Sequence, residues 1–321
     1  MQKLPRVRMA HLPTAVEPLP RLSEALGGPA LLVKRDDQTG LAFGGNKTRK
    51  LEFLVAEAQR QGARTLITAG AVQSNHCRQT AAAAARCGFD CLLVLAGEEP
   101  ERATGNLLLD HLLGAEIFWA ARENREEVLQ STYQQAMDDD RKPYLIPYGG
   151  SNPTGAAAYA FALQEMLAQG FSPEVIVFAS SSGGTQAGLL AGARIFGFEG
   201  RVLGISVDEK AEVLRARVAT LANQTAETMG ENISFRAEDV WVNDNFLGAG
   251  YGAMGRGEEE AIKLFARTEG LLLDPVYTGR AAAGLVSLIG EGVFSAGQSV
   301  LFWHTGGTPA LFAERYRNLA G

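Results

Sequence analysis

Phe43-Gly44-Gly45-Asn46-Lys47-Thr48-Arg49-Lys50-Leu51-Glu52 places one lysine directly behind two glycines, at the start of a predicted helix over residues 47–61. We expect Asn46 to be the N-cap of this helix, and its apolar stripe to consist of Leu51, Leu54, Val55 and Ala58. Lys47 lies on the stripe, one turn before Leu51, whereas Arg49 points away from it and Lys50 lies on its flank. Of the three cations, Lys47 is therefore the one predicted to face the protein interior.

A lysine that is buried without a counter-ion has a lowered pKa, which frees its amine to act as a nucleophile or a base near neutral pH. The preceding glycines allow a flat ligand to approach the backbone closely. The alternative is a basic first turn that extends into water, which is the commoner environment for a run of lysine and arginine. Residues 43–52 alone leave both interpretations open.

The composition is that of a globular protein with one large or two smaller domains, because 321 residues with 46% hydrophobic content can bury a substantial core. The 30 basic and 36 acidic residues give a formal charge of -6 without a basic face, so nucleic-acid binding is not expected. Cys77, Cys87 and Cys91 have no metal-binding spacing and are expected to be reduced thiols in a cytoplasmic protein. No apolar run is long enough to predict a membrane span.

Short apolar strands alternate with helices along most of the chain. Strands are predicted at residues 30–34, 64–68, 91–95, 116–119, 144–147, 175–179, 202–207, near 240, 271–273 and 300–304. Helices are predicted at residues 19–25, 47–61, 74–87, 105–113, 124–137, 153–168, 185–196, 258–268 and 279–289. This alternation is typical of parallel sheets covered on both faces, so the predicted class is α/β.

Ligands of open parallel sheets bind at the carboxyl ends of the strands, so the loops that follow strands are candidate sites. Residues 69–76 end in Ser74-Asn75-His76 and open a helix whose N-terminus can hold a carboxylate, although simple capping by Ser74 is the alternative. Ser180-Ser181-Ser182-Gly183-Gly184-Thr185 combines hydroxyls, glycines and a helix N-terminus, which favours a phosphate over an ordinary tight turn. Its spacing matches neither GxGxxG nor the P-loop, so a dinucleotide or ATP is not indicated.

Two further loops, residues 274–279 and 304–308, each follow a predicted strand and open a helix, and Gly250-Tyr251-Gly252 adds an aromatic side chain between glycines. A lysine together with a phosphate cradle and hydroxyls suggests pyridoxal phosphate, whose aldehyde reacts with lysine and whose phosphate needs an anchor. No metal ligand set is expected.

Several blocks of the chain resemble the D-cysteine desulfhydrase and 1-aminocyclopropane-1-carboxylate (ACC) deaminase family of pyridoxal-phosphate enzymes, with the closest resemblance to the desulfhydrases. These blocks are Val33-Lys34-Arg35-Asp36-Asp37, residues 44–52, Gln73-Ser74-Asn75-His76, the serine-glycine turn, Asp274-Pro275-Val276-Tyr277-Thr278-Gly279 and His304-Thr305-Gly306-Gly307. The resemblance implies the tryptophan-synthase-β-like fold (fold type II), in which the cofactor lies between two parallel-sheet, three-layer domains. It further implies a large domain of residues 1–49 and 157–321, a smaller inserted domain of residues 50–156, and a homodimer.

The resemblance also implies roles for individual residues. Lys47 is expected to bond covalently to the cofactor, and Asn75 to contact the cofactor's ring hydroxyl. Ser74 would bind the substrate carboxylate or assist catalysis, Asn75 and His76 would add substrate contacts, and Tyr251 and Tyr277 would act on the substrate side. The other cofactor-binding residues implied by the resemblance are Ser181, Ser182, Gly183, Gly184, Thr185, Thr278 and Thr305.

The residue at position 278 separates activities within this family. True ACC deaminases resemble one another in having glutamate there, which can keep the pyridine nitrogen protonated, whereas the hydroxyl of Thr278 supports a neutral ring. His76, where the deaminases resemble one another in having glutamine, points the same way. We therefore predict α,β-elimination of a small amino acid, with D-cysteine converted to pyruvate, sulfide and ammonia.

Three alternatives remain at this point. An L-cysteate sulfo-lyase resembles the chain at Gly149-Gly150-Ser151-Asn152-Pro153-Thr154-Gly155, but its anionic leaving group requires an extra cation or more hydrogen-bond donors near the β position. The others are an ACC deaminase, which would release 2-oxobutanoate and ammonia, and a pyridoxal-phosphate-binding protein without catalysis.

Overall fold

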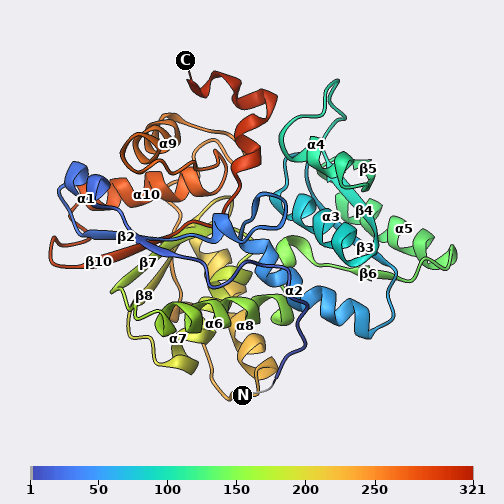
Figure 1. Ribbon diagram of the computed structural model, residues 1–321, viewed down its shortest axis with the longest axis horizontal. Coiled ribbons are helices and arrows are strands. Elements are labelled where there is room, and N and C mark those ends of the chain that lie inside the picture. The colour runs from blue at the N-terminus through green and yellow to red at the C-terminus, as the bar shows by residue number, and fades with distance from the viewer. Residues whose placement is uncertain (1–2, 321) are drawn as a thin grey trace.

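The computed structural model describes residues 3–320, which form two β-sheets with helices packed on both faces of each (Figure 1). The larger sheet has the strand order β1-β2-β10-β7-β8-β9 and is parallel except for β1, which pairs with β2 in the antiparallel direction. Its strands are β1 (Val16–Pro18), β2 (Ala30–Lys34), β7 (Val175–Ser180), β8 (Arg201–Ser206), β9 (Trp241–Asn243) and β10 (Ser299–Trp303).

The smaller sheet is wholly parallel, with the order β5-β4-β3-β6. Its strands are β3 (Thr65–Ala71), β4 (Asp90–Ala96), β5 (Glu116–Ala120) and β6 (Pro143–Leu145). All four therefore lie, in the sequence, between the two segments that build the larger sheet. The domain limits implied by the resemblance remain a proposal; both fall inside helices, at residues 49–50 and 156–157.

Ten α-helices surround the sheets within residues 3–320. They are α1 (Pro20–Leu26), α2 (Asn46–Arg60), α3 (Asn75–Cys87), α4 (Gly105–Leu112), α5 (Arg125–Asp138), α6 (Pro153–Ala168), α7 (Gly184–Phe196), α8 (Ala211–Thr228), α9 (Arg256–Glu269) and α10 (Thr278–Gly290). Short 3-10 segments include Asp36–Gln38, Leu41–Phe43, Tyr148–Gly150, Ala237–Asp239, Thr308–Phe312 and Glu314–Ala320.

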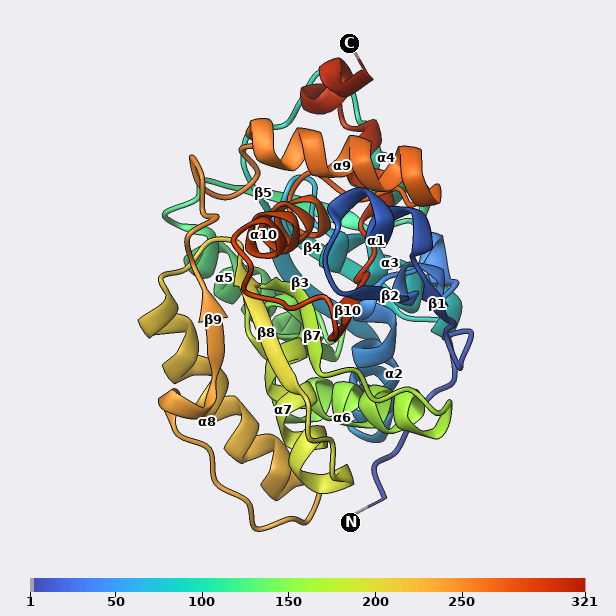
Figure 2. The same ribbon diagram turned by 90° about the vertical axis from the view of Figure 1, so that its left-hand side faces the viewer.

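Alternating side chains of the central strand β7 fill two separate cores. Val175 and Val177 pack in the core shared with α1, α9 and α10, whereas Ile176 and Phe178 pack in the core shared with α6 and α7. Figure 2 shows α1, α9 and α10 above this sheet and α6 and α7 below it. This division confirms the predicted three-layer α/β arrangement, because a continuous apolar strand is buried on both faces only when helices cover both.

Most predicted elements are confirmed, but three expectations were wrong or incomplete. The segment 271–273 is not a strand: Leu271 and Leu273 are buried in the core of α9 and α10, but the segment pairs with no strand among the described residues. The helix α8 and the antiparallel edge strand β1 were not predicted. Gly45, not Asn46, is the N-cap of α2, and Asn46 is its first helical residue.

The prediction that Lys47 alone of the three cations faces the interior was also wrong. Arg49 and Lys50 are both almost completely buried, at 2% and 1% exposure, and Lys47 is partly buried. Arg49 is accommodated by two carboxylates, since its Nη2 lies 2.8 Å from Asp36 Oδ1 and 2.9 Å from Glu165 Oε1. This ion-pair network fixes α2 against β2 and α6, and so fixes the helix that carries Lys47.

Within residues 3–320, no helix has both the length and the apolar character that a membrane span requires. The same part of the chain contains no group of His, Cys, Asp and Glu side chains arranged to hold a metal ion.

Candidate active site

Loops from both sheets meet at the N-terminus of α2 and enclose a narrow pocket around Lys47, which we call the lysine pocket. The segment after β3 contributes Ser74, Asn75 and His76, and the turn after β7 contributes residues 180–185. The pocket is lined by Asn46, Lys47, Lys50, Ser74, Asn75, His76, Tyr148, Gly149, Ala179, Ser180, Ser181, Ser182, Gly183, Thr185, Tyr277, Thr305 and Gly306. The structure thus brings together residues predicted from four separate loops, three of which follow parallel strands, where ligands of such sheets bind, while the fourth follows the non-strand segment 271–273.

The two glycines before Lys47 allow backbone segments to approach one another closely. Gly44 and Gly45 have φ values of 64° and 119°, which favour glycine, and a Cβ at Gly44 would lie 2.1 Å from the Asp37 carbonyl oxygen. The amide of Asn46 then donates to the Thr305 carbonyl at 2.9 Å. The glycines therefore join the start of α2 to the loop after β10.

Lys47 has the environment of a reactive amine. Its Nζ donates to Asn46 Oδ1 at 3.1 Å and lies 5.9 Å from the centre of the Tyr277 ring. Burial lowers the pKa of Lys47 to about 8, with a further lowering from the Arg78 charge and an opposing effect of Asp274. A substantial fraction of the amine is consequently neutral near physiological pH, as a nucleophile or general base requires.

Lys50, one turn after Lys47, is a second buried lysine of the pocket. Its Nζ donates to the Gly149 carbonyl at 3.1 Å and to Ser151 Oγ at 3.3 Å, both of them neutral groups. Burial and the Lys47 charge lower the pKa of Lys50 well below its usual value. No carboxylate pairs with Lys50 in the described part of the chain, so an anionic ligand is what this ammonium lacks.

The turn after β7 fits a phosphate group next to Lys50. The amide of Gly184, at the start of α7, donates to Ser151 Oγ at 3.2 Å, and Ser182 Oγ lies 2.7 Å from the same hydroxyl. A Cβ at Gly184 would lie 2.5 Å from Ser151 Oγ and 2.9 Å from Lys50 Nζ, so a larger residue here would displace these two polar groups. Hydroxyls, a helix N-terminus and a buried cation together form the donor set that a phosphate needs.

Ser74, Asn75 and His76 form the opposite wall. Ser74 caps α3, because its Oγ accepts from the Cys77 amide at 3.1 Å. Thr68 Oγ1 donates its only proton to the Ile146 carbonyl, so it must accept from His76 Nε2 at 2.9 Å. Burial lowers the pKa of His76 well below its usual value, and the neutral ring therefore carries its proton on Nε2.

Tyr251 and Tyr277 form a hydrogen-bonded pair, with hydroxyl oxygens 2.7 Å apart and rings inclined at 76°. Tyr277 lines the lysine pocket, whereas Tyr251 lines the wide cleft outside it. Burial raises the pKa values of both phenols, so both are protonated at neutral pH.

Thr305 lines the lysine pocket, but Thr278 lies outside the residues that line it. The Thr278 hydroxyl donates to Asp274 Oδ1 at 2.8 Å and accepts from the Asp274 amide at 2.7 Å. The hydroxyl therefore already donates its single proton to Asp274, and one acceptor lone pair of Thr278 remains free. The role of Thr278 in cofactor binding stays a prediction.

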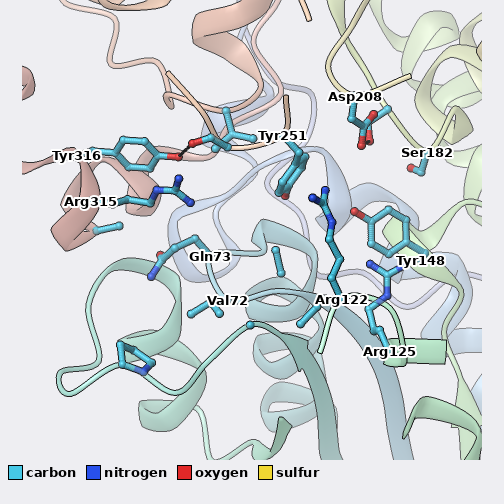
Figure 3. A pocket seen from close by; sticks show the side chains of 18 of the residues that line it. Val72, Gln73, Arg122, Arg125, Tyr148, Ser182, Asp208, Tyr251, Arg315 and Tyr316 are labelled. Atoms are coloured by element: carbon cyan, nitrogen blue, oxygen red, sulfur yellow. Dashed lines mark hydrogen bonds between the residues drawn. The ribbon is translucent and has the colours of Figure 1, made fainter. Parts of the chain in front are cut away.

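The lysine pocket opens through Tyr148, Ser181 and Ser182 into a cleft of about 1490 Å³. Figure 3 shows Arg122, from the loop before α5, pointing toward Tyr251, and Arg125 beneath Tyr148. The Arg125 guanidinium carbon lies 4.9 Å from the centre of the Tyr148 ring. Neither arginine has a carboxylate within ion-pair distance among residues 3–320, although Asp208 and Glu209 line the same cleft.

Sequence reasoning missed Lys50, Arg122 and Arg125 as site residues. Lys50 carries a readable signal, because it is three residues after Lys47 on the same helix and so faces the same side. The sequence contains no such signal for Arg122 and Arg125, since their approach to the cleft depends on how the two sheets are placed.

Comparisons with known proteins agree with this geometry. The model of the family "Pyridoxal-phosphate dependent enzyme" matches residues 7–306. The chain is 41% identical over 322 residues to a D-cysteine desulfhydrase of Klebsiella pneumoniae, covering 98% of this chain and 97% of the relative. It is 40% identical over 329 residues to a 1-aminocyclopropane-1-carboxylate deaminase of Burkholderia cenocepacia, with coverage of 98% and 97%.

A solved crystal structure of an ACC deaminase homologue matches the fold with a TM-score of 0.88 and 37% identity, covering 97% of this chain and 94% of that one. The fold is accordingly type II, the tryptophan-synthase-β-like fold, and the cofactor is pyridoxal phosphate. The chain belongs to the pyridoxal-phosphate-dependent enzymes, in the group of lyases that contains the D-cysteine desulfhydrases and the ACC deaminases.

Proposed function

We propose that this enzyme is a D-cysteine desulfhydrase, which converts D-cysteine to pyruvate, sulfide and ammonia. Relatives of both names are equally similar, so the choice depends on the site itself. The observation that carries the proposal is that position 278 holds a threonine hydroxyl and not a carboxylate. Without a carboxylate there, the site suits departure of a good β leaving group better than opening of an unactivated cyclopropane.

In this proposal each wall of the lysine pocket has one task. Ser182, Gly184, Thr185 and Lys50 hold the phosphate, and Ser74 with the N-terminus of α3 holds the substrate carboxylate. Pyridoxal phosphate, when bound, supplies an electron sink for the electron pair of the α C–H bond.

The elimination moves one proton and breaks one carbon–sulfur bond. The neutral amine of Lys47 removes the α proton, and the Cβ–S bond breaks with its electron pair on sulfur. Water then hydrolyses the released 2-aminoacrylate to pyruvate and ammonia. Tyr277 lies beside Lys47 and is paired with Tyr251, so this phenol pair orients the substrate from the cleft side.

The substrate proposal is tested by assaying the cofactor-loaded protein with D-cysteine, L-cysteine, L-cysteate and ACC. We expect pyruvate and sulfide from D-cysteine at a kcat/KM well above the values for the other three. Release of 2-oxobutanoate from ACC at a higher kcat/KM would overturn the proposal while leaving the cofactor site intact.

A second candidate, an L-cysteate sulfo-lyase, is favoured by one observation. A sulfonate leaving group needs a cation near the β position, and Arg122 and Arg125 bring two guanidinium groups into the cleft. Both charges act on Tyr148. Burial raises the pKa of its phenol, and the two arginines lower it.

We predict that Arg122→Gln weakens the binding of L-cysteate about tenfold or more, because a charge-assisted contact is lost. The binding is measured as the KM of L-cysteate if it is a substrate, or as its inhibition constant if it is a competitive inhibitor. The kcat/KM for D-cysteine should change by less than roughly threefold, because only a long-range charge is lost for this substrate. Arg236→Gln, at a site whose side chain is 78% exposed, makes the same charge change elsewhere and serves as control. Equal effects of both variants would show that Arg122 contacts no substrate anion.

Lys50→Met tests the phosphate site. We predict that the dissociation constant for pyridoxal phosphate rises roughly 10- to 100-fold, the effect of losing a hydrogen bond to a charged group. The unfolding free energy of the cofactor-free protein should not fall, because methionine replaces an uncompensated buried ammonium. Cofactor titration followed by fluorescence measures the first quantity, and urea denaturation the second. Unchanged cofactor affinity would place the phosphate elsewhere.

The predicted homodimer and cytoplasmic location are kept as proposals. Size-exclusion chromatography with light scattering checks the first of them.

A further inference from the structure

Asn106, the second residue of α4, is completely buried between the lysine pocket and Arg78. Its Oδ1 accepts from Arg78 Nε at 3.1 Å, and its Nδ2 donates to the Gln73 carbonyl at 3.0 Å. A guanidinium can only donate and a carbonyl can only accept, so these partners permit one orientation of the Asn106 amide.

That orientation determines how the neighbouring Asn75 is presented. Asn106 Nδ2 also donates to Asn75 Oδ1 at 2.9 Å. The acceptor end of the Asn75 amide is thereby occupied, while its Nδ2 has no protein partner within residues 3–320. Asn75 lines the lysine pocket, so the group it offers there is an N–H donor.

The other end of this chain of hydrogen bonds is equally fixed. Arg78 is fully buried, and its Nη1 donates to the Ala42 and Gly44 carbonyls, just before Lys47. Burial lowers the pKa of Arg78 to about 10, with Asp110 opposing, so the side chain is cationic at neutral pH and cannot accept. Arg78, which can only donate, therefore sets the direction of donation along this series of hydrogen bonds.

A second contact holds the backbone around Asn106. Gln73 Oε1 accepts from the Asn106 amide at 2.8 Å, and Gln73 Nε2 donates to the Thr104 carbonyl at 2.8 Å. Gln73 therefore connects the loop after β3 to the start of α4 and keeps Asn106 within reach of Asn75.

We propose that Arg78 and Asn106 are positioning residues that keep the NH2 end of Asn75 directed into the pocket, where it donates to the ring oxygen of the bound cofactor. This inference rests on the proposed role of Asn75 in the cofactor site. A donor at this place stabilises the deprotonated form of that oxygen, and loss of the donor favours the protonated form.

The test uses Asn106→Asp. A carboxylate accepts from Arg78 but cannot donate to Asn75, so the Asn75 amide must rotate and turn its oxygen toward the pocket. We expect the ratio of protonated to deprotonated ring oxygen, read from the absorbance bands of the loaded enzyme at fixed pH, to rise about tenfold, the effect of one hydrogen bond to a charged group. Asn106→Ala, which only releases Asn75, should give a smaller rise of about threefold and provides the test if Asn106→Asp does not fold.

Three further variants separate the possible causes. Asn75→Ala should shift the spectrum in the same direction, and the double variant Asn75→Ala/Asn106→Asp should shift it no further than Asn75→Ala alone. Asn223→Asp is the matched control, because Asn223 also bonds its amide to fixed backbone partners, the N–H and carbonyl of Phe235, at a distance from the pocket. It should cost stability without changing the spectrum.

A wild-type spectrum in both Asn106 variants, together with a shift in Asn75→Ala, would overturn the positioning role but leave the role of Asn75 intact. A wild-type spectrum in Asn75→Ala would instead overturn the proposed contact of Asn75 with the cofactor. An equal shift in Asn223→Asp would show that the Asn106 effect is a general loss of stability.

Discussion

Replacing Lys47 with alanine will reduce the release of pyruvate from the preferred substrate by roughly a thousandfold or more, since in the proposed mechanism Lys47 is both the covalent attachment point and the general base. The physical reason lies in the surroundings of its amine. Burial and Arg78 bring the pKa of Lys47 to about 8, and its Nζ faces Tyr277 inside the lysine pocket. No other amine of the pocket can take over, because Lys50 Nζ is bonded to Gly149 and Ser151.

Lys50→Met is the matched control for this experiment. The two lysines are one helical turn apart, and both lose an ammonium group, but only Lys47 is assigned to the reaction. At saturating pyridoxal phosphate we expect Lys50→Met to retain much of the kcat of the wild type. Turnover of Lys47→Ala near the wild-type rate, or equal losses in the two variants, would contradict the assignment. Partial recovery of Lys47→Ala in the presence of a small primary amine would support it.

Replacing Asp36 with alanine will destabilise the protein by about 3–5 kcal/mol, the usual cost of removing one partner from a buried ion pair. Asp36 is fully buried and accepts two bonds from Arg49, at 2.8 and 2.9 Å, one from Tyr159 at 2.6 Å and one from Trp303 at 2.8 Å. Its removal leaves several buried donors without an acceptor and weakens the attachment of α2. Urea denaturation of the cofactor-free protein measures the loss.

Glu260→Ala is the control for the Asp36 prediction, because Glu260 pairs with Arg256 on the surface of α9, with side chains 62% and 90% exposed. Its effect should stay within about 1 kcal/mol. If Asp36→Ala also lowered the unfolding free energy by no more than about 1 kcal/mol, the network would not be what holds α2.

The Asp36 contribution also depends on pH. Burial opposes its ionisation, but Arg49, Tyr159 and Trp303 outweigh burial, so the pKa of Asp36 lies below its usual value. A carboxylate of this kind stabilises the fold fully above its unfolded pKa of about 4 and loses that contribution as the pH falls below it. The difference in unfolding free energy between the wild type and Asp36→Ala should therefore be constant near neutral pH and become smaller in acid.

Local patterns sufficed to predict most of the fold. The strand β7 and the helix α6 both lie where the sequence predicted them, and α6 begins with Asn152 as N-cap and Pro153 in its first turn. These features depend on neighbouring residues only. Helix α8 was missed although Leu214, Val218, Leu221 and Ala222 recur at helical spacing, so its signal was present in the sequence.

The errors around α2 have a different origin. Arg49 was predicted to face solvent because a helix pattern contains no information about Asp36 or Glu165, which come from elsewhere in the chain. The segment 271–273 has the composition of a strand, but it finds core contacts without a strand partner. Burial of a charge and pairing of a strand are both decided by tertiary context.

The site shows the same division. The sequence pointed to Lys47 because it opens a helix behind two glycines, and to the serine-glycine turn and Ser74-Asn75-His76 because each lies at a strand-to-helix turn. The structure brings them into one pocket. The inward direction of Lys50, the hydrogen bonds of Asn106 and the approach of Arg122 to the cleft are set by contacts between distant segments. Of these three, only the direction of Lys50 has a signal in the spacing, because Lys50 is three residues after Lys47 on α2.

The most direct test of the central assignment is to reduce the cofactor-loaded protein with borohydride and locate the phosphopyridoxyl group by peptide mass spectrometry. We expect the label on Lys47, with Lys50 unmodified, because the Lys47 amine faces Tyr277 whereas the Lys50 amine is bonded to the Gly149 carbonyl and the Ser151 hydroxyl. A label on Lys50, or on a lysine outside the pocket, would contradict it.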